Sequence, residues 1–198
     1  NTNNITLLDK IQSNPGSGSI VHNTYIYDDY AITSWYKDGF TITDVARPAN
    51  LVQVGNYDTY PEGAGNGFSG DWGVYPYLPS GNIIVSNISA FGTNNGELWI
   101  FTPTYVRGCY LEGTVTHAST GNPLNGAIVQ ILSTSNTETP PSNGQYKMGQ
   151  LQSGSFTPQV SKTGFVTQQI PITMTNGVLT SLNVALQPVS LPVELVSF

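Results

Sequence analysis

Leu111-Glu-Gly-Thr-Val-Thr116 and Ala127-Ile-Val-Gln-Ile-Leu132 are the two runs of the 198-residue sequence that decide its fold, and Ser119-Thr-Gly-Asn-Pro-Leu-Asn-Gly126 joins them. The first run alternates apolar and polar residues, the second is rich in branched aliphatic residues, and the joining stretch is rich in residues that favour turns. Further strands are predicted over residues 145–148, 155–161, 166–172 and 180–186. Six or seven short strands in roughly 80 residues predict an immunoglobulin-like or transthyretin-like β-sandwich.

The composition of the chain changes sharply near residue 108. All seven Asp, all three Trp and nine of the eleven Tyr precede it, whereas the later part is rich in Thr, Ser, Gln and Val. Such a shift is a signal of a domain boundary. We therefore predict one domain over residues 1–107, a second over 108–188, and a linker over 189–198.

The charge pattern narrows the classes of partner. Charged residues are only 9% of the chain and the net charge is −6, with no basic run. This composition argues against nucleic acid and anionic lipid as partners and favours a cation over an anion.

The single cysteine, Cys109, cannot form an intrachain disulfide. No run of 18 apolar residues and no signal-peptide pattern is present; if the protein is exported, its signal is expected to lie upstream or to have been removed.

The part of the chain before residue 108 contains a weak internal repeat. Residues 22–34 align with residues 72–86, matching Tyr25 with Tyr75 and Ser34 with Ser86. Phe40-Thr-Ile-Thr-Asp44 then aligns with Leu98-Trp-Ile-Phe-Thr102. A period of about 50 residues is typical of a four-stranded propeller blade with long loops. The first domain is thus predicted to be a partial β-propeller of about two four-stranded blades.

These residues resemble a known family. Asp38-Gly-Phe-Thr-Ile-Thr-Asp-Val-Ala-Arg-Pro48 is similar to an LVIVD-type repeat. Asp71-Trp-Gly-Val-Tyr-Pro-Tyr-Leu-Pro-Ser-Gly-Asn-Ile-Ile-Val-Ser86 resembles the last blades of the "choice-of-anchor B" surface proteins of Bacteroidetes. The resemblance implies a secreted propeller displayed on the cell surface. A closed propeller needs at least about four blades, so either further blades precede this part or it packs differently from its relatives.

The later part resembles the carboxypeptidase regulatory-like, or transthyretin-like, domain. The residues that carry this resemblance are the Gly113–Leu124 pattern G-x-V-x-x-x-x-T-G-x-P-L, Asn143-Gly-Gln-Tyr146 and Lys162-Thr-Gly-Phe165. We expect the hydroxyl of Tyr146 to point toward water from the edge of the core. The tail, with Leu191-Pro-Val-Glu-Leu195, resembles the segment before the C-terminal sorting domain of type IX secretion cargo, which implies an extracellular or outer-membrane location.

Two sets of residues are candidates for binding. Asp58, Glu62 and Asp71 lie in a Gly-rich acidic stretch that could hold calcium, or could be a plain surface loop. His22, Tyr25, Trp35, Trp72 and Tyr75 are the candidate ligand contacts, because Trp and Tyr faces suit sugar rings, with packing between strands as the alternative. No Ser/His/Asp triad is expected, since His22 and His117 are the only histidines.

Together these features predict a non-catalytic structural or adhesion protein. We expect no cofactor, except that the sequence leaves a bound calcium ion open. The expected partners are other surface or secretion-system proteins, and glycans. Two alternatives stay open: a glycan- or protein-binding module, and a fragment of a propeller hydrolase whose catalytic residues lie elsewhere. A calcium titration, a glycan array and the sequence upstream of Asn1 would separate these readings.

Overall fold

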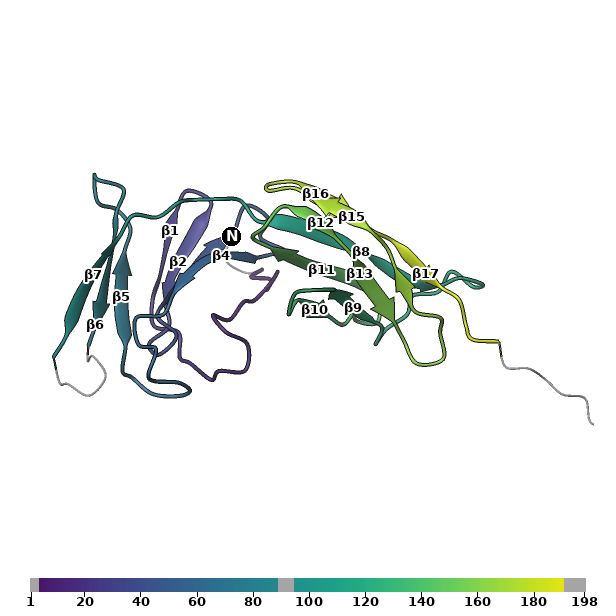
Figure 1. The fold of residues 1–198 in the computed structure, drawn as a ribbon, viewed down its shortest axis with the longest axis horizontal. Coiled ribbons are helices and arrows are strands. Elements are labelled where there is room, and N and C mark those ends of the chain that lie inside the picture. Colours follow the sequence, from purple (N-terminus) through teal and green to yellow (C-terminus); the bar gives the residue numbers. More distant parts are fainter. Residues whose placement is uncertain (1–3, 89–94, 191–198) are drawn as a thin grey trace, which may run out of the picture. The chain divides into compact units, whose positions relative to one another are not determined.

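The computed structural model describes residues 4–88 and 95–190, all as strands, turns and loops (Figure 1). The chain divides into two compact units. The first comprises Asn1–Cys109 and Gly149–Gln152, and the second comprises Tyr110–Met148 and Ser153–Phe198. No helix in the described part of the chain is long and apolar enough to cross a membrane. The predicted sorting-region tail, Leu191–Leu195, lies outside the described residues.

The first sheet of the first unit is an antiparallel meander of four strands in the order β1-β2-β3-β4. The strands are β1 (Thr24–Tyr27), β2 (Tyr30–Ser34), β3 (Phe40–Asp44) and β4 (Val52–Tyr57). Their turns follow the local sequence: Asp28 and Gly39 both adopt positive φ, which Asp tolerates and Gly favours. A Cβ at Gly39 would meet the carbonyl oxygen of Tyr57 at 2.0 Å, so glycine is required there.

The second sheet has three strands, not the four that the repeat length predicts. They are β5 (Asp71–Tyr75), β6 (Ile83–Asn87) and β7 (Glu97–Phe101), in that order. After Phe101 the chain returns to the first sheet, where Tyr105 stacks on Tyr27 and Arg107 pairs with Asp44. These contacts, together with Pro103, which has no N–H to give to a sheet, divert the segment that would have formed a fourth strand.

The two sheets carry the repeated residues in the same cross-strand register. Tyr25, Ile32 and Ile42 are neighbours across β1, β2 and β3. Tyr75, Ile84 and Ile100 are neighbours in the same way across β5, β6 and β7. The sheets pack face to face, with the Phe40 and Phe101 rings 4.9 Å apart. They do not close into a ring within the described residues, so the structure establishes an all-β unit and no complete propeller.

The second unit is a set of short strands in small sheets. One sheet has the order β10-β9-β13-β14, a second has β11-β8-β16 with β17 also on β8, and β12 pairs with β15. The bounds of these strands are β8 (Cys109–His117), β9 (Ile128–Ile131), β10 (Thr137–Glu138), β11 (Gln145–Gln150), β12 (Gly154–Phe156), β13 (Pro158–Ser161), β14 (Gln168–Gln169), β15 (Ile172–Met174), β16 (Leu179–Ser181) and β17 (Val184–Leu186). Buried aliphatic side chains fill the space between the layers, as in a β-sandwich: Leu111, Val115, Val129, Ile131, Val160, Met174 and Leu186.

Three single strands expected in this unit are each divided in two. The expected strand over residues 155–161 becomes β12 and β13, and the one over 166–172 becomes β14 and the start of β15. Pro158 is the first residue of β13, and Pro171 lies between β14 and β15. Proline has no N–H to donate to a neighbouring strand. The strand over 180–186 divides into β16 and β17, which both run parallel to β8. Each division moves the chain from one pairing to the next.

Tyr146 corrects another expectation. Its ring is buried, and its hydroxyl donates a hydrogen bond of 2.6 Å to the carbonyl oxygen of Leu182 instead of pointing to water. Burial raises the pKa of the Tyr146 phenol. Gly113 allows the same close approach, because a Cβ there would meet the Leu182 oxygen at 1.8 Å. The loop between β16 and β17 is therefore held against β8 and β11.

Candidate functional site

Four tyrosines form a continuous surface on the first unit, which we call the tyrosine surface: Tyr25, Tyr27, Tyr75 and Tyr77. Tyr25 and Tyr27 lie on the same face of β1 because side chains alternate along a strand. The ring of Tyr25 is 6.2 Å from that of Tyr75 and 5.8 Å from that of Tyr77, both edge to face. Tyr75 and Tyr77 are 45% and 44% exposed, so part of each ring remains open to a ligand.

The tyrosine surface is held in place from beneath. The hydroxyl of Tyr77 donates to the carbonyl oxygen of Ile26. The ring of Tyr105 stacks on Tyr27 at 5.3 Å with an interplanar angle of 23°. Burial raises the pKa of Tyr105, so this phenol stays neutral as the ring packs. Aromatic rings fixed in this way bind without a large loss of side-chain entropy.

An ion pair anchors the segment that carries Tyr105. Arg107 Nη1 donates a hydrogen bond of 3.0 Å to Asp44 Oδ1, and Nη2 donates to Asp29. The guanidinium also lies 5.3 Å from the centre of the Tyr30 ring. The hydrogen bond to Asp29 raises the pKa of Arg107 above its ordinary value, and Asp44 adds to this effect. The sequence analysis missed this anchor, because it joins residues that are far apart in the chain.

The candidate ligand residues separate into two groups in the structure. Trp35 is buried and its Nε1 donates a hydrogen bond of 2.9 Å to Thr41 Oγ1, so it belongs to the packing of the first sheet. Tyr25 and Tyr75 belong to the tyrosine surface. Trp72 is exposed, and the His22 ring lies 4.4 Å from it. Of the five candidates, the structure therefore leaves four with accessible surface.

His22 has a structural contact as well as an exposed side chain. Its Nδ1 hydrogen-bonds to the carbonyl oxygen of Trp72. Because a carbonyl oxygen only accepts, Nδ1 must carry the proton, and Nε2 accepts in the neutral ring. Its backbone N–H donates to the carbonyl oxygen of Ser34 at 2.9 Å. The residue therefore links the start of the first sheet to β5.

The three calcium candidates differ in their surroundings. Asp58 and Glu62 are exposed, and Asp58 Oδ1 accepts a hydrogen bond of 2.8 Å from the backbone of Tyr60. Asp71 is fully buried, at the start of β5. Among residues 4–88 and 95–190, no three His, Cys, Asp or Glu side chains come together as a metal site. The three residues thus do not gather as one set of side-chain ligands.

Asp71 is the most perturbed carboxyl group of the described chain. Neither of its carboxylate oxygens has a hydrogen-bond partner of normal distance and angle. Burial raises the pKa of Asp71 to about 8, and the backbone N–H of Gly73 opposes this rise without cancelling it. The backbone of Asp71 is fixed by reciprocal hydrogen bonds with Tyr36 of 2.8 and 3.0 Å. The side chain is therefore held between the sheets, mostly protonated at neutral pH.

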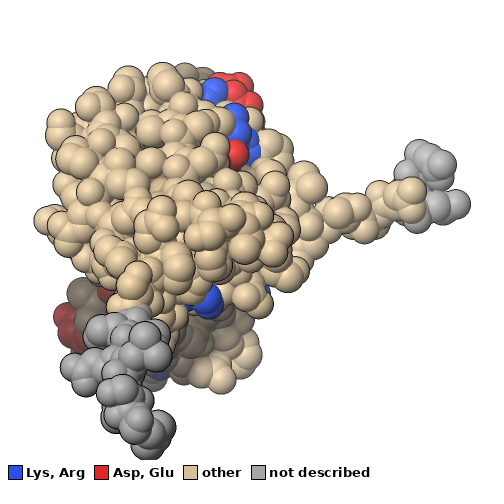
Figure 2. Space-filling model, turned by 90° about the vertical axis from the view of Figure 1, so that its right-hand side faces the viewer, with Lys and Arg blue, Asp and Glu red and all other residues tan. Residues whose placement is uncertain are grey.

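Charged groups are sparse on the surface of the molecule. Figure 2 shows one face on which Lys, Arg, Asp and Glu are few and uncharged residues predominate. This fits the 9% of charged residues in the sequence. A ligand that meets such a surface would be recognised through aromatic stacking and neutral hydrogen bonds.

Comparisons with solved structures give remote similarities. GBS52, the minor pilin of Streptococcus agalactiae, matches 62% of this chain and 66% of its own at 12% identity, with a TM-score of 0.38. The match with a streptococcal ancillary pilin covers 56% of this chain and 43% of the pilin, at 14% identity and with a TM-score of 0.32. The match with the Bacillus anthracis TIE protein covers 89% of this chain and 40% of the TIE protein, at 12% identity and with a TM-score of 0.36. The chain thus spans less than two thirds of the length of each, and TM-scores of this size do not establish a shared fold.

The comparison with protein families is more specific. No curated protein matches the chain. The family model of the carboxypeptidase regulatory-like domain matches residues 110–187, from the second residue of β8 to the residue after β17. This is the region that the motifs around Gly113, Asn143 and Lys162 indicate, and its strands form the small β-sandwich described above. Residues 110–187 therefore match the carboxypeptidase regulatory-like domain in sequence.

Proposed function

We propose that this chain is a non-catalytic adhesion module of a secreted or cell-surface protein, and that the tyrosine surface binds a neutral glycan. The observation that carries the proposal is the arrangement of Tyr25, Tyr27, Tyr75 and Tyr77, whose rings are 5.6 to 6.2 Å apart between neighbours and partly open. Pyranose rings stack on such aromatic faces, and phenol hydroxyl groups donate to and accept from sugar hydroxyl groups.

The proposal extends to the first unit as a whole. Its two sheets would be consecutive blades of a propeller of the LVIVD type, which further blades would complete. Support comes from the shared register of Tyr25, Ile32 and Ile42 with Tyr75, Ile84 and Ile100. The carboxypeptidase regulatory-like domain would act as a spacer. Export as type IX secretion cargo rests on the sequence resemblance of Leu191–Leu195 alone.

A glycan array with the whole chain tests the binding function. We expect binding to a neutral oligosaccharide that becomes at least about tenfold weaker, or about 1.4 kcal/mol, in Tyr75→Ala. Phe68→Ala is the matched control, because Phe68 is an exposed aromatic residue of the same unit outside the tyrosine surface. Equal loss in both variants, or no binding to any glycan by the folded chain, would refute glycan recognition by this surface.

A further inference from the structure

Three rings of the tyrosine surface form a corner. The ring centres of Tyr25, Tyr75 and Tyr77 are 5.6 to 6.2 Å apart, and the interplanar angles of the three pairs are 77°, 84° and 82°. Rings that are all nearly perpendicular to one another do not offer one flat platform, as parallel rings would. The flat face of a pyranose therefore stacks on one of these rings at a time, whereas a small apolar group can contact all three.

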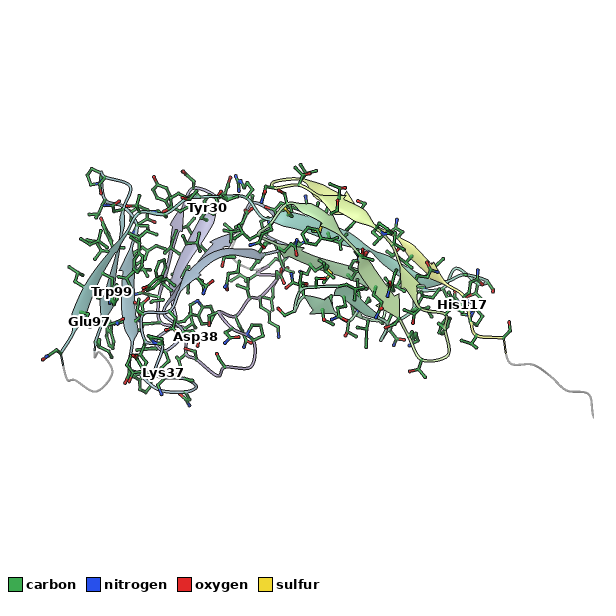
Figure 3. All side chains as sticks on the ribbon, viewed as in Figure 1. Tyr30, Lys37, Asp38, Glu97, Trp99 and His117 are labelled. Carbon is green, nitrogen blue, oxygen red and sulfur yellow. The ribbon has the colours of Figure 1, made fainter. Side chains whose placement is uncertain are left out.

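The corner is complete within the two sheets of the first unit. It lies at β1 and β5, which are the first strands and the edge strands of their sheets. Tyr75 and Tyr77 both contact Tyr25 of the other sheet, so the corner needs no further sheet to form. Figure 3 labels Glu97 and Trp99 on β7, which is the opposite edge of the β5–β7 sheet.

The hydroxyl group of Tyr77 adds a polar requirement to the corner. Its one proton is donated to the carbonyl oxygen of Ile26. Toward a ligand, the Tyr77 oxygen can therefore only accept a hydrogen bond. A group that matches the corner thus combines a compact apolar part with an N–H or O–H donor beside it.

We propose that this corner binds the acetamido group of an N-acetylated hexosamine in a neutral glycan. The acetamido methyl group fills the space between the three rings, and the amide N–H donates to the oxygen of Tyr77. A plain hexose offers a donor at this position but no methyl group, and a quaternary ammonium offers methyl groups but no donor. The inference rests on the proposed glycan binding and names the sugar that the tyrosine surface prefers.

Isothermal titration calorimetry of the whole chain with two trisaccharides tests this preference. Chitotriose and cellotriose have the same linkage and differ only in bearing an acetamido or a hydroxyl group on the second carbon of each ring. We expect chitotriose to bind at least about tenfold more tightly, because the buried methyl group and the added hydrogen bond both favour it.

Two matched variants locate the preference. Tyr77→Phe keeps the ring and removes the acceptor, so it should weaken chitotriose binding by about threefold to tenfold and leave cellotriose binding within about twofold. Tyr57→Phe is the control, because Tyr57 is 45% exposed in the same unit but contacts Trp99 and Phe101 instead of the corner. It should bind both trisaccharides as the unmodified chain does.

The outcomes separate this inference from the proposed function. Equal affinity for the two trisaccharides overturns the acetamido preference and leaves glycan binding intact. Equal weakening of both by Tyr77→Phe also overturns it, since that result indicates a general role of the ring. If neither trisaccharide binds, the inference falls, and the glycan array decides whether the proposed function falls with it.

Discussion

Replacement of Asp71 by Asn should stabilise the first unit at neutral pH. The carboxyl group is fully buried, has no hydrogen-bond partner of normal geometry, and has a pKa of about 8 in the folded chain. In the unfolded chain the pKa of Asp is about 3.9. Asn keeps the shape of the protonated acid and does not ionise. Folding of the Asn variant therefore carries no free-energy cost for protonating a carboxylate.

The size of the effect follows from the two pKa values. Because the folded pKa is the higher one, the group stabilises the fold fully below pH 4, and that contribution is lost as the pH rises toward 8. Each pH unit in this window lowers the free energy of unfolding by about 1.4 kcal/mol. At pH 7 the loss amounts to about 4 kcal/mol, a large part of the 5–15 kcal/mol by which domains are usually stable.

Urea unfolding at pH 5, 6, 7 and 8 measures this slope. Tryptophan fluorescence reports on the first unit alone, since Trp35, Trp72 and Trp99 all lie in it. We expect the free energy of unfolding of the unmodified chain to fall across this range, and that of Asp71→Asn to stay nearly level. Asp28→Asn is the control, because Asp28 is an exposed turn carboxylate whose positive φ Asn also tolerates.

Two results would refute the reasoning about Asp71. One is an unmodified chain whose stability does not fall between pH 5 and 8. The other is an Asn variant that is less stable than the unmodified chain at every pH. Either result means that the carboxylate is ionised in the folded chain and held by a partner such as a cation. Added calcium would then raise the melting temperature of the unmodified chain and not that of the variant.

Three further substitutions test the anchors of the fold, each by urea unfolding. Arg107→Gln should destabilise the first unit by about 2 kcal/mol, because it removes the Arg107 charge from beside the buried Asp44 carboxylate while the half-exposed site allows some hydration; an unchanged stability would contradict this. Tyr146→Phe should cost about 1–2 kcal/mol in the second unit by removing the donor to the Leu182 oxygen, and a neutral effect would show that water replaces the hydroxyl. Gly113→Ala should cost more than about 2 kcal/mol, since its Cβ would lie 1.8 Å from that same oxygen; equal stability would mean that the loop around Leu182 moves freely.

Several features of the fold were accessible from the sequence. The alternation in Leu111–Thr116 and the turn that ends at Gly126 predict the start of the sandwich, and the family comparison confirms this domain over residues 110–187. The repeat aligned Tyr25 with Tyr75, and the structure places these two residues at equivalent register positions. Local patterns succeed here because side-chain alternation and turn geometry depend on neighbouring residues only.

The candidate site depended on contacts that no local pattern contains. The aromatic residues were recognisable by type, but only the tertiary packing divides them into the buried Trp35 and the partly open Tyr75. Asp71 stands beside Gly and Trp in the sequence and looks like a surface loop residue, yet it is fully buried. Its isolation arises from the reciprocal backbone bonds with Tyr36, which lies 35 positions earlier.

The sequence by itself determined that this protein is built from short strands, where its composition changes, and which residues repeat. Only the tertiary structure decided that the second copy of the repeat lacks a fourth strand, because Tyr105 and Arg107 return the chain to the first sheet. It also decided that Ile100 is open while Ile42 is covered. The physical reason is that burial belongs to pairs of surfaces, and identical residues differ in exposure when only one of them has a sheet packed against it.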